Sequence, residues 1–348
     1  MALVKPDWHP VTSFLDSAVA AGAAPGAVLG ISMAGTRFLY CTGQLGADDP
    51  SPVTPSTVYD LASLTKVVAL TTAVMLAVDE GRLDLDVSIQ RYLPAFTGAG
   101  KERVTARLLL THAGGMPAWR PLQLEADSRA GAMKLAAETP LKWTPGTAEV
   151  YSDLGLIVLT QALETVYHER LDSLLQRQVF QPLGMPSVRF LPPHGDRDGI
   201  APTELDPWRG RVLRGEVHDE NAARMDGVSG HAGLFGSAPD LLTFAEWVLA
   251  NPSALAEFTR RQNLVPGSSR ALGWDTPSPG GSAGRLLSPN AFGHTGFTGT
   301  SLWIDPDRRL AIVLLSNRVN PTRNNPRWNP IRARIAELVM TTLFEDAR

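Results

Sequence analysis

The residues best suited to chemistry lie in the segment Ser63-Leu64-Thr65-Lys66. A serine hydroxyl is a weak nucleophile until a base accepts its proton. Residues three apart lie on one face of a helix, so this spacing would bring the Lys66 amine to the Ser63 hydroxyl. If Ser63 opens the helix, its backbone N–H is unpaired and can stabilise an oxyanion. The alternative is an N-capping serine followed by a surface lysine.

A base for this serine could come from two places. Lys66 is followed by the apolar run Val67-Val68-Ala69-Leu70, which predicts a buried amine. Burial lowers the pKa of a lysine, as a lysine base requires. Tyr151 stands just before a predicted helix, and a tyrosine near a lysine can share its proton and act as the general base. The alternative for Tyr151 is a half-buried residue beside a helix cap.

A third segment, His294-Thr295-Gly296, stands where strand-like sequence returns after a long helical stretch. An edge strand at this point could bind the backbone of a substrate through hydrogen bonds. The backbone N–H of the next residue, Phe297, could then be a second oxyanion donor. The alternative is an ordinary strand start with an unrelated histidine.

Together the three segments resemble the serine β-lactamase and penicillin-binding-protein superfamily. The pattern Ser-x-x-Lys, Tyr-Ser-x and [Lys/His]-Thr-Gly is similar to class C β-lactamases and the related esterases, D-aminopeptidases and cell-wall amidases. The segment 109–115 also resembles these proteins. The resemblance implies that Ser63 is the acylated nucleophile, that Lys66 and Tyr151 share the base role, and that the backbone N–H groups of Ser63 and Phe297 form the oxyanion hole. It implies neither a metal nor an organic cofactor.

The sequence departs from the β-lactamase pattern at two positions. His294 replaces a lysine, and a histidine is largely neutral at pH 7 unless a neighbour raises its pKa. Asp153 replaces an asparagine, and an ionised carboxylate has no hydrogen to donate. Both changes weaken the binding of a substrate carboxylate and disfavour efficient β-lactam hydrolysis. Asp153 could instead pair with Lys66 and hold it charged, which would leave base catalysis to Tyr151.

The segments 201–206, 214–222 and 230–235 resemble a subgroup that includes bacterial cell-wall-fragment amidases and proteins similar to penicillin-binding proteins. They contain His218, Asp219, Glu220 and His231. These residues either face the substrate from a loop over the cleft or only brace the site through hydrogen bonds. Metal binding is a third alternative, but no ligand triplet with zincin spacing is present. The residues expected to bind substrate are Asp153, His218, His294, Thr295 and Gly296.

The elements that must position these residues follow a simple order along the chain. Strand-like segments lie near both ends, and helical patterns separated by Pro and Gly fill the middle. This order predicts an α+β fold, in which an antiparallel β-sheet made from both chain ends is flanked by helices and carries a large, mostly helical insertion. Residues 1–62 plus 250–348 are expected to form the sheet domain, residues 63–249 a mostly helical domain, and the active site their interface.

Composition narrows the function further. The chain has 348 residues, a net charge of −3 and scattered basic residues, so no nucleic-acid partner is expected. The single cysteine, Cys41, excludes an intrachain disulfide and a zinc site built on thiolates. The first residues lack the apolar region of a signal peptide, and no segment is expected to span a membrane, so we expect a cytoplasmic protein. The one Gly-x-Ser-x-Gly match, at residues 280–284, precedes no predicted helix and is interpreted as a flexible loop, so it does not indicate a nucleophile elbow.

We therefore expect a serine acyl hydrolase that forms a covalent acyl-enzyme on Ser63. Its substrate would be an amide or ester of a peptide-like, cell-wall-derived or other small molecule. Two alternatives stay open. The chain could be a penicillin-recognising β-lactamase or D,D-peptidase, or it could be a sensor that is acylated without turnover. The oligomeric state does not follow from the sequence.

Overall fold

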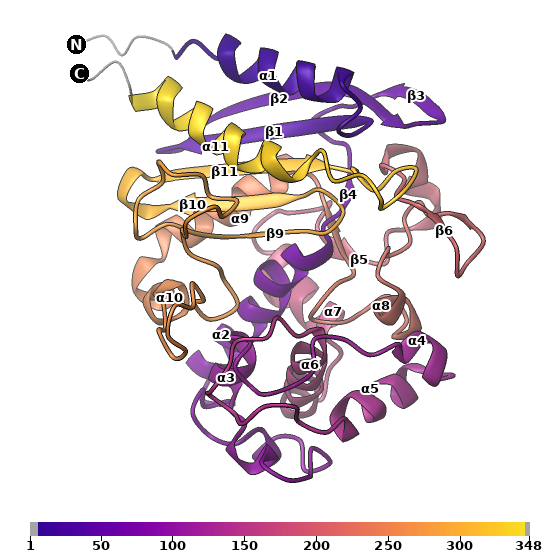
Figure 1. Ribbon diagram of the computed structural model, residues 1–348, viewed down its shortest axis with the longest axis vertical. Helices are drawn as coiled ribbons and strands as arrows, with labels where there is room; N and C mark the ends of the chain where they lie inside the picture. Colours follow the sequence, from indigo (N-terminus) through magenta and orange to yellow (C-terminus); the bar gives the residue numbers. More distant parts are fainter. Residues whose placement is uncertain (1–5, 345–348) are drawn as a thin grey trace.

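The computed structural model describes residues 6–344 and contains a six-stranded antiparallel sheet with the order β3-β2-β1-β11-β10-β9 (Figure 1). Three of its strands come from each end of the chain, which confirms the predicted fold class. The strands are β1 (Gly26–Met33), β2 (Thr36–Gly46), β3 (Asp49–Pro52), β9 (Phe292–Thr295), β10 (Ser301–Asp305) and β11 (Leu310–Ser316).

The two chain ends meet at the centre of the sheet. β1 pairs with β11 in a continuous register that runs from Ala27 opposite Ser316 to Met33 opposite Leu310. Both strands are apolar and buried, as expected where helices cover the two faces of a sheet. The edge strand β3 consists of Asp, Ser and Pro residues, which favour turns but are tolerated in a short edge strand.

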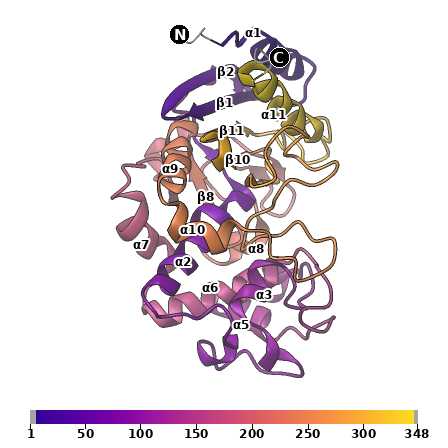
Figure 2. The same cartoon turned by 90° about the vertical axis from the view of Figure 1, so that its left-hand side faces the viewer.

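Helices cover both faces of this sheet (Figure 2). The helices α1 (His9–Ala20) and α11 (Asn329–Phe344) pack against each other and against one face. The helix α9 (Ala238–Ala250) packs against β1 and β11 on the other face. By its position in the sequence α9 falls in the part predicted to be mostly helical, but in space it belongs to the sheet layers.

The remaining helices lie on the far side of α9 from the sheet (Figures 1 and 2). These helices share one buried apolar cluster with the face of the sheet that α9 covers. The division of the chain into two domains stays a prediction. These helices are α2 (Thr72–Asp79), α3 (Ala106–Leu110), α4 (Leu122–Glu125), α5 (Arg129–Glu138), α6 (Asp153–Tyr167), α7 (Leu171–Leu175), α8 (Glu220–Arg224) and α10 (Pro252–Thr259). Short strands form two small sheets, β4 (Tyr59–Asp60) with β8 (Leu234–Gly236) and β5 (Arg189–Phe190), and β6 (Leu205–Asp206) with β7 (Arg211–Val212).

The helical segment that begins at Ser63 runs from the sheet into the helical part. It starts as a 3₁₀ turn, η1 (Ala62–Leu64), widens into the π-helical η2 (Lys66–Thr71) and continues as α2. π-helical turns are rare in proteins, and those that occur are often found at functional sites. By length and composition Ala62–Asp79 could cross a membrane, but 78% of it is buried inside the protein, as in a core helix.

Candidate active site

Ser63 lies on a strained turn that its neighbours hold in place. The preceding residue, Ala62, has a φ of 47°, a left-handed conformation that is unfavourable for a residue with a Cβ. The buried side chain of Asp60 stabilises this turn, because its Oδ1 accepts a hydrogen bond from the Ala62 N–H at 2.8 Å. The other carboxylate oxygen accepts from the His218 N–H at 2.6 Å. The turn is thus fixed from two separate segments of the chain.

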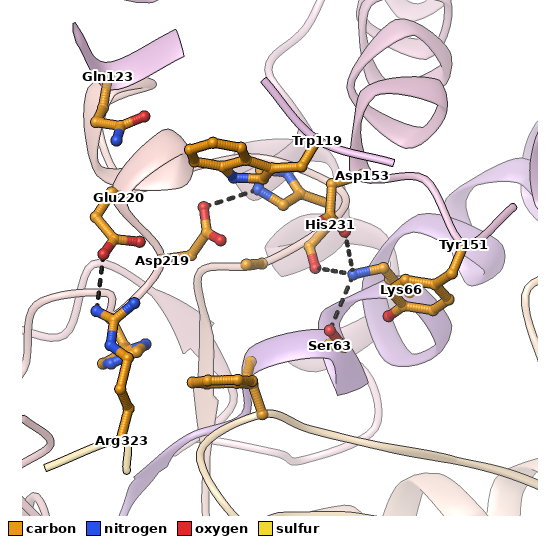
Figure 3. A pocket seen from close by; sticks show the side chains of 14 residues that line it. Ser63, Lys66, Trp119, Gln123, Tyr151, Asp153, Asp219, Glu220, His231 and Arg323 are labelled. Carbon is orange, nitrogen blue, oxygen red and sulfur yellow. Dashed lines mark hydrogen bonds and ion pairs between the residues drawn. The ribbon is translucent and has the colours of Figure 1, made fainter. Parts of the chain in front are cut away.

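Lys66 is 1% exposed and reaches three acceptors with its amine (Figure 3). Its Nζ donates to Ser63 Oγ at 2.9 Å and to the His231 carbonyl at 2.8 Å. The third partner is Asp153, in an ion pair with 2.8 Å between Nζ and Oδ1. An ammonium group has three donors and no acceptor, so this environment fits the charged form of the lysine.

The charge of Lys66 differs from the first expectation. Burial lowers the pKa of Lys66, but the charges and hydrogen bonds of Asp153 and Tyr151 outweigh burial and raise the pKa above its ordinary value. The prediction of a lowered pKa is therefore wrong, because the apolar run after Lys66 indicated burial but not the partner. The pairing of Asp153 with Lys66, which the sequence left open, is present in the structure.

Tyr151 lies close to two cations. Lys66 Nζ is 5.0 Å from the centroid of its ring, and Arg270 Cζ is 5.4 Å from the same centroid. The rings of His112 and His294 lie 4.5 Å and 6.0 Å away, measured between centroids. The Tyr151 hydroxyl points toward the Ser63–Lys66 pair (Figure 3). Both cations attract negative charge on the phenol oxygen.

The two predicted oxyanion donors belong to turns that are tied together. Within residues 6–344, no protein group accepts a hydrogen bond from the backbone N–H of Ser63 or of Phe297. The turn that contains Phe297 bonds to the residues just before Ser63. The Thr298 hydroxyl donates to the Asp60 carbonyl at 2.8 Å, and the Thr300 hydroxyl donates to the Leu61 carbonyl at 3.0 Å.

A cavity of about 380 Å³ opens at this place (Figure 3). It brings together six of the predicted site residues, which come from four distant stretches of the chain. Its lining consists of Ala62, Ser63, Lys66, Trp119, Gln123, Tyr151, Asp153, His218, Asp219, Glu220, His231, Ala232, Phe297 and Arg323.

The segment His294-Thr295-Gly296 forms the end of the edge strand β9 and the residue after it, as predicted, but is not part of the cavity lining. His294 is buried, and its Nδ1 lies 2.8 Å from the Thr295 carbonyl. Burial, together with the positive charges of Arg270 and Lys66, lowers the pKa of His294 to about 3. The side chain is therefore neutral at pH 7, as expected. A role of these three residues in binding substrate stays a prediction.

The polar loop around His218 both lines the cavity and braces it. His218 Nε2 is 2.7 Å from Glu204 Oε2, and the same carboxylate oxygen accepts from Arg323 Nε at 2.5 Å. His231 Nε2 is 2.9 Å from Asp219 Oδ1. The loop can therefore both face the cavity and brace it, so these two alternatives do not exclude each other.

Sequence reasoning did not single out several residues of the site. Gln123 and Arg323 line the cavity, and Arg270 contacts Tyr151. No local motif marks them, because each reaches the site from a loop or short helix distant in sequence. Within residues 6–344, no group of three or more His, Cys, Asp or Glu side chains is arranged to hold a metal ion.

Comparison with known proteins agrees with this geometry. A family model described as Beta-lactamase matches residues 11–337. A relative from Salmonella paratyphi B with the provisional name D-alanyl-D-alanine carboxypeptidase is 32% identical, over 81% of this chain and 74% of the relative.

Solved structures share the fold. A class C β-lactamase from Rhodobacter sphaeroides has a TM-score of 0.73 and 22% identity, over 95% of this chain and 99% of the other. A structure of SurE with D-Leu has a TM-score of 0.71 and 25% identity, over 94% of this chain and 74% of the other. The chain belongs to the β-lactamase family and is a serine hydrolase.

Proposed function

We propose that the chain cleaves an amide or ester bond by forming a covalent acyl-enzyme on Ser63, with Tyr151 as the general base. The observation that carries this proposal is the set of three acceptors around Lys66 Nζ. A lysine held as an ammonium cannot accept a proton, so the base must be another group. Because Lys66 donates to Ser63 Oγ, the serine hydrogen is free for another acceptor, and the Tyr151 hydroxyl points toward this pair (Figure 3).

The reaction then follows from the positions of these groups. Tyr151, as the phenolate, accepts the Ser63 proton while Oγ attacks the acyl carbon. The negative charge that develops on the acyl oxygen is bound by the backbone N–H groups of Ser63 and Phe297. Tyr151 passes the proton to the leaving group. Water then attacks the ester on Ser63, with Tyr151 again accepting the proton, and releases the acid.

For the substrate we propose a small peptide-like acyl donor that contains a D-residue. The support is the name of the 32% identical relative and the D-Leu in the SurE structure. Asp153 lies in the cavity lining and its carboxylate pairs with Lys66, so this residue offers no amide donor to a β-lactam. We therefore expect slow β-lactam turnover.

The test is a substrate panel with Ser63→Ala as the blank. It contains p-nitrophenyl acetate, the p-nitroanilides of D- and L-alanine, a D-alanyl-D-alanine peptide, an N-acetylmuramoyl peptide and nitrocefin. The proposal expects turnover of the ester and of at least one D-residue substrate, together with a mass increase on Ser63 in quenched samples. One equivalent of product followed by arrest indicates a sensor. Hydrolysis that survives in Ser63→Ala overturns the proposal.

A further inference from the structure

The peptide unit between Gly296 and Phe297 has a charged partner on its carbonyl side. Arg332, in the first turn of α11, donates from Nη2 to the Gly296 oxygen at 2.6 Å. The Gly299 N–H donates to the same oxygen at 3.2 Å. The N–H of this peptide unit belongs to Phe297, the residue that lines the cavity. One peptide group therefore joins a buried guanidinium to the proposed oxyanion site.

Within residues 6–344, Arg332 is buried and has no counterion. Its side chain is 8% exposed, its Nε has no hydrogen-bond partner, and its other acceptor is the neutral Asn329 Oδ1 at 3.2 Å. Burial and the neighbouring Arg318 lower the pKa of Arg332 to about 10, so it is still charged at pH 7. The second arginine lies over the Phe297 ring, with its Cζ 4.7 Å from the ring centroid. Positive charge thus gathers behind Phe297.

A purely structural role does not explain this arrangement. Burying a cation without a carboxylate is costly, and an apolar side chain of similar size at such a position is often neutral or stabilising. The Gly296 oxygen already accepts a hydrogen bond from Gly299, so its satisfaction does not require Arg332. The guanidinium of Arg332 adds a positive charge, with its Nη2 2.6 Å from the carbonyl oxygen of the Gly296–Phe297 peptide.

We propose that Arg332 is a positioning residue that orients and polarises the Gly296–Phe297 peptide, so that the Phe297 N–H becomes a stronger donor to the oxyanion. The inference rests on the proposed function of Ser63 and Phe297. A hydrogen bond from a charged donor draws electron density toward the carbonyl oxygen and strengthens the hydrogen bond made by the N–H of the same group. The effect is large only where water is excluded, as it is around Arg332.

The test compares Arg332→Met and Arg332→Lys with the wild type and with Arg334→Gln. Arg334 lies on the same helix, but its side chain is 54% exposed and it pairs with Glu337, so it is the matched control. With p-nitrophenyl acetate, Arg332→Met is expected to lower kcat about ten-fold, less than the loss of an oxyanion donor itself, with KM nearly unchanged. Arg332→Lys restores part of kcat, and Arg334→Gln retains all of it. The melting temperature of Arg332→Met should be equal to or above that of the wild type.

A spectroscopic readout separates polarisation from folding. The infrared stretch of the acyl carbonyl, measured on the trapped acyl-enzyme, should move to higher frequency in Arg332→Met, because a weaker donor polarises this carbonyl less. An unchanged frequency with unchanged kcat overturns the inference, as does a loss of activity that only follows the loss of folded protein. If the wild type forms no acyl-enzyme, the proposed function fails as well, so the two failures are distinguishable.

Discussion

Lys66 and Arg332 are both buried cations beside the catalytic turns, but they differ in their counterions. Lys66 has the Asp153 carboxylate at 2.8 Å, whereas in the described part of the chain the partners of Arg332 are the neutral oxygens of Gly296 and Asn329. A counterion fixes the charge of Lys66 and confines its field. Without one, the field of Arg332 extends along the peptide to Phe297. The comparison indicates that the proton-transfer side of the site depends on a defined charge state, and the oxyanion side on net positive potential.

The largest effect is expected from removing the paired cation. Lys66→Met should lower kcat/KM for ester hydrolysis by about 10³-fold, because Ser63 Oγ loses its donor and Tyr151 loses one of its two cations. Steady-state kinetics measure this. Lys101→Met is the matched control, since Lys101 is equally buried but lies against Phe96. Comparable losses in both variants would show that the effect comes from burial rather than from the site.

On the oxyanion side, the largest effect is expected from Gly296→Ala. A Cβ at this position would lie 2.0 Å from Thr300 Oγ1 and 2.6 Å from the Leu61 carbonyl, so the turn must move away from Ser63. We expect kcat to fall by about 10²-fold and stability by about 2 kcal/mol. Kinetics and urea unfolding measure the two changes. Retention of wild-type kcat would show that this turn does not need its present position.

Removing only the counterion should have a smaller effect. In Asp153→Asn the pKa of Lys66 falls, because burial still lowers it and the Asp153 carboxylate no longer raises it. We expect a loss of about ten-fold in ester hydrolysis at pH 7. The decline of kcat/KM at high pH should begin at a lower pH than in the wild type. The asparagine also supplies an amide donor, so nitrocefin hydrolysis should fall less than ester hydrolysis, and equal losses would contradict this role.

The same pair predicts how stability depends on pH. The folded-state pKa of Lys66 lies above the value of 10.5 for an unfolded lysine, so the stability from its charged form is fully present below pH 10.5 and is lost as the pH rises beyond it. Urea unfolding of the wild type from pH 9.5 upward to pH 12 should show this loss beginning above pH 10.5. The loss should be smaller in Asp153→Asn, where of Asp153 and Tyr151 only Tyr151 still raises the pKa of Lys66.

The smallest effect on activity is expected at His294. The folded-state pKa of His294, about 3, lies below the unfolded value of 6.5. The neutral ring therefore stabilises the folded protein above pH 6.5, and this contribution is lost as the pH falls below 6.5. The contribution at pH 5 is about 2 kcal/mol. His294→Gln should therefore lose less stability between pH 7 and pH 5 than the wild type, with kcat at pH 7 little changed. A large fall in kcat would instead place His294 in the reaction.

The elements near the site could be predicted because their signals are local. The strand Gly26–Met33 is marked by a run of apolar residues that ends just before Gly35, and the helix Arg129–Glu138 begins after the capping residue Ser128. The segment from Ser63 to Asp79 was also expected to be helical. Its π-helical part was not, because the extra backbone spacing depends on tertiary packing.

The candidate site was only partly predictable for the same reason. Ser63, Lys66 and Tyr151 stand in short motifs, so their meeting could be expected. Arg270 and Arg332 stand in no motif, and their charges act through groups that the fold brings close. The direction of the Lys66 pKa shift depends on Asp153, a partner 87 positions away in the sequence. The motif that contains Asp153 suggested this pair, but only the folded structure shows that the two side chains are in contact.

The pairing of β1 with β11 has a consequence for biosynthesis. The ribosome completes β1 early, but its central partner emerges only when nearly the whole chain has been made. Until then an apolar strand has one side unpaired, and such an edge can associate with other chains. Assembly of this sheet is therefore expected to be slow and to follow release of the nascent polypeptide. Expression at low temperature or with a chaperone should raise the soluble yield.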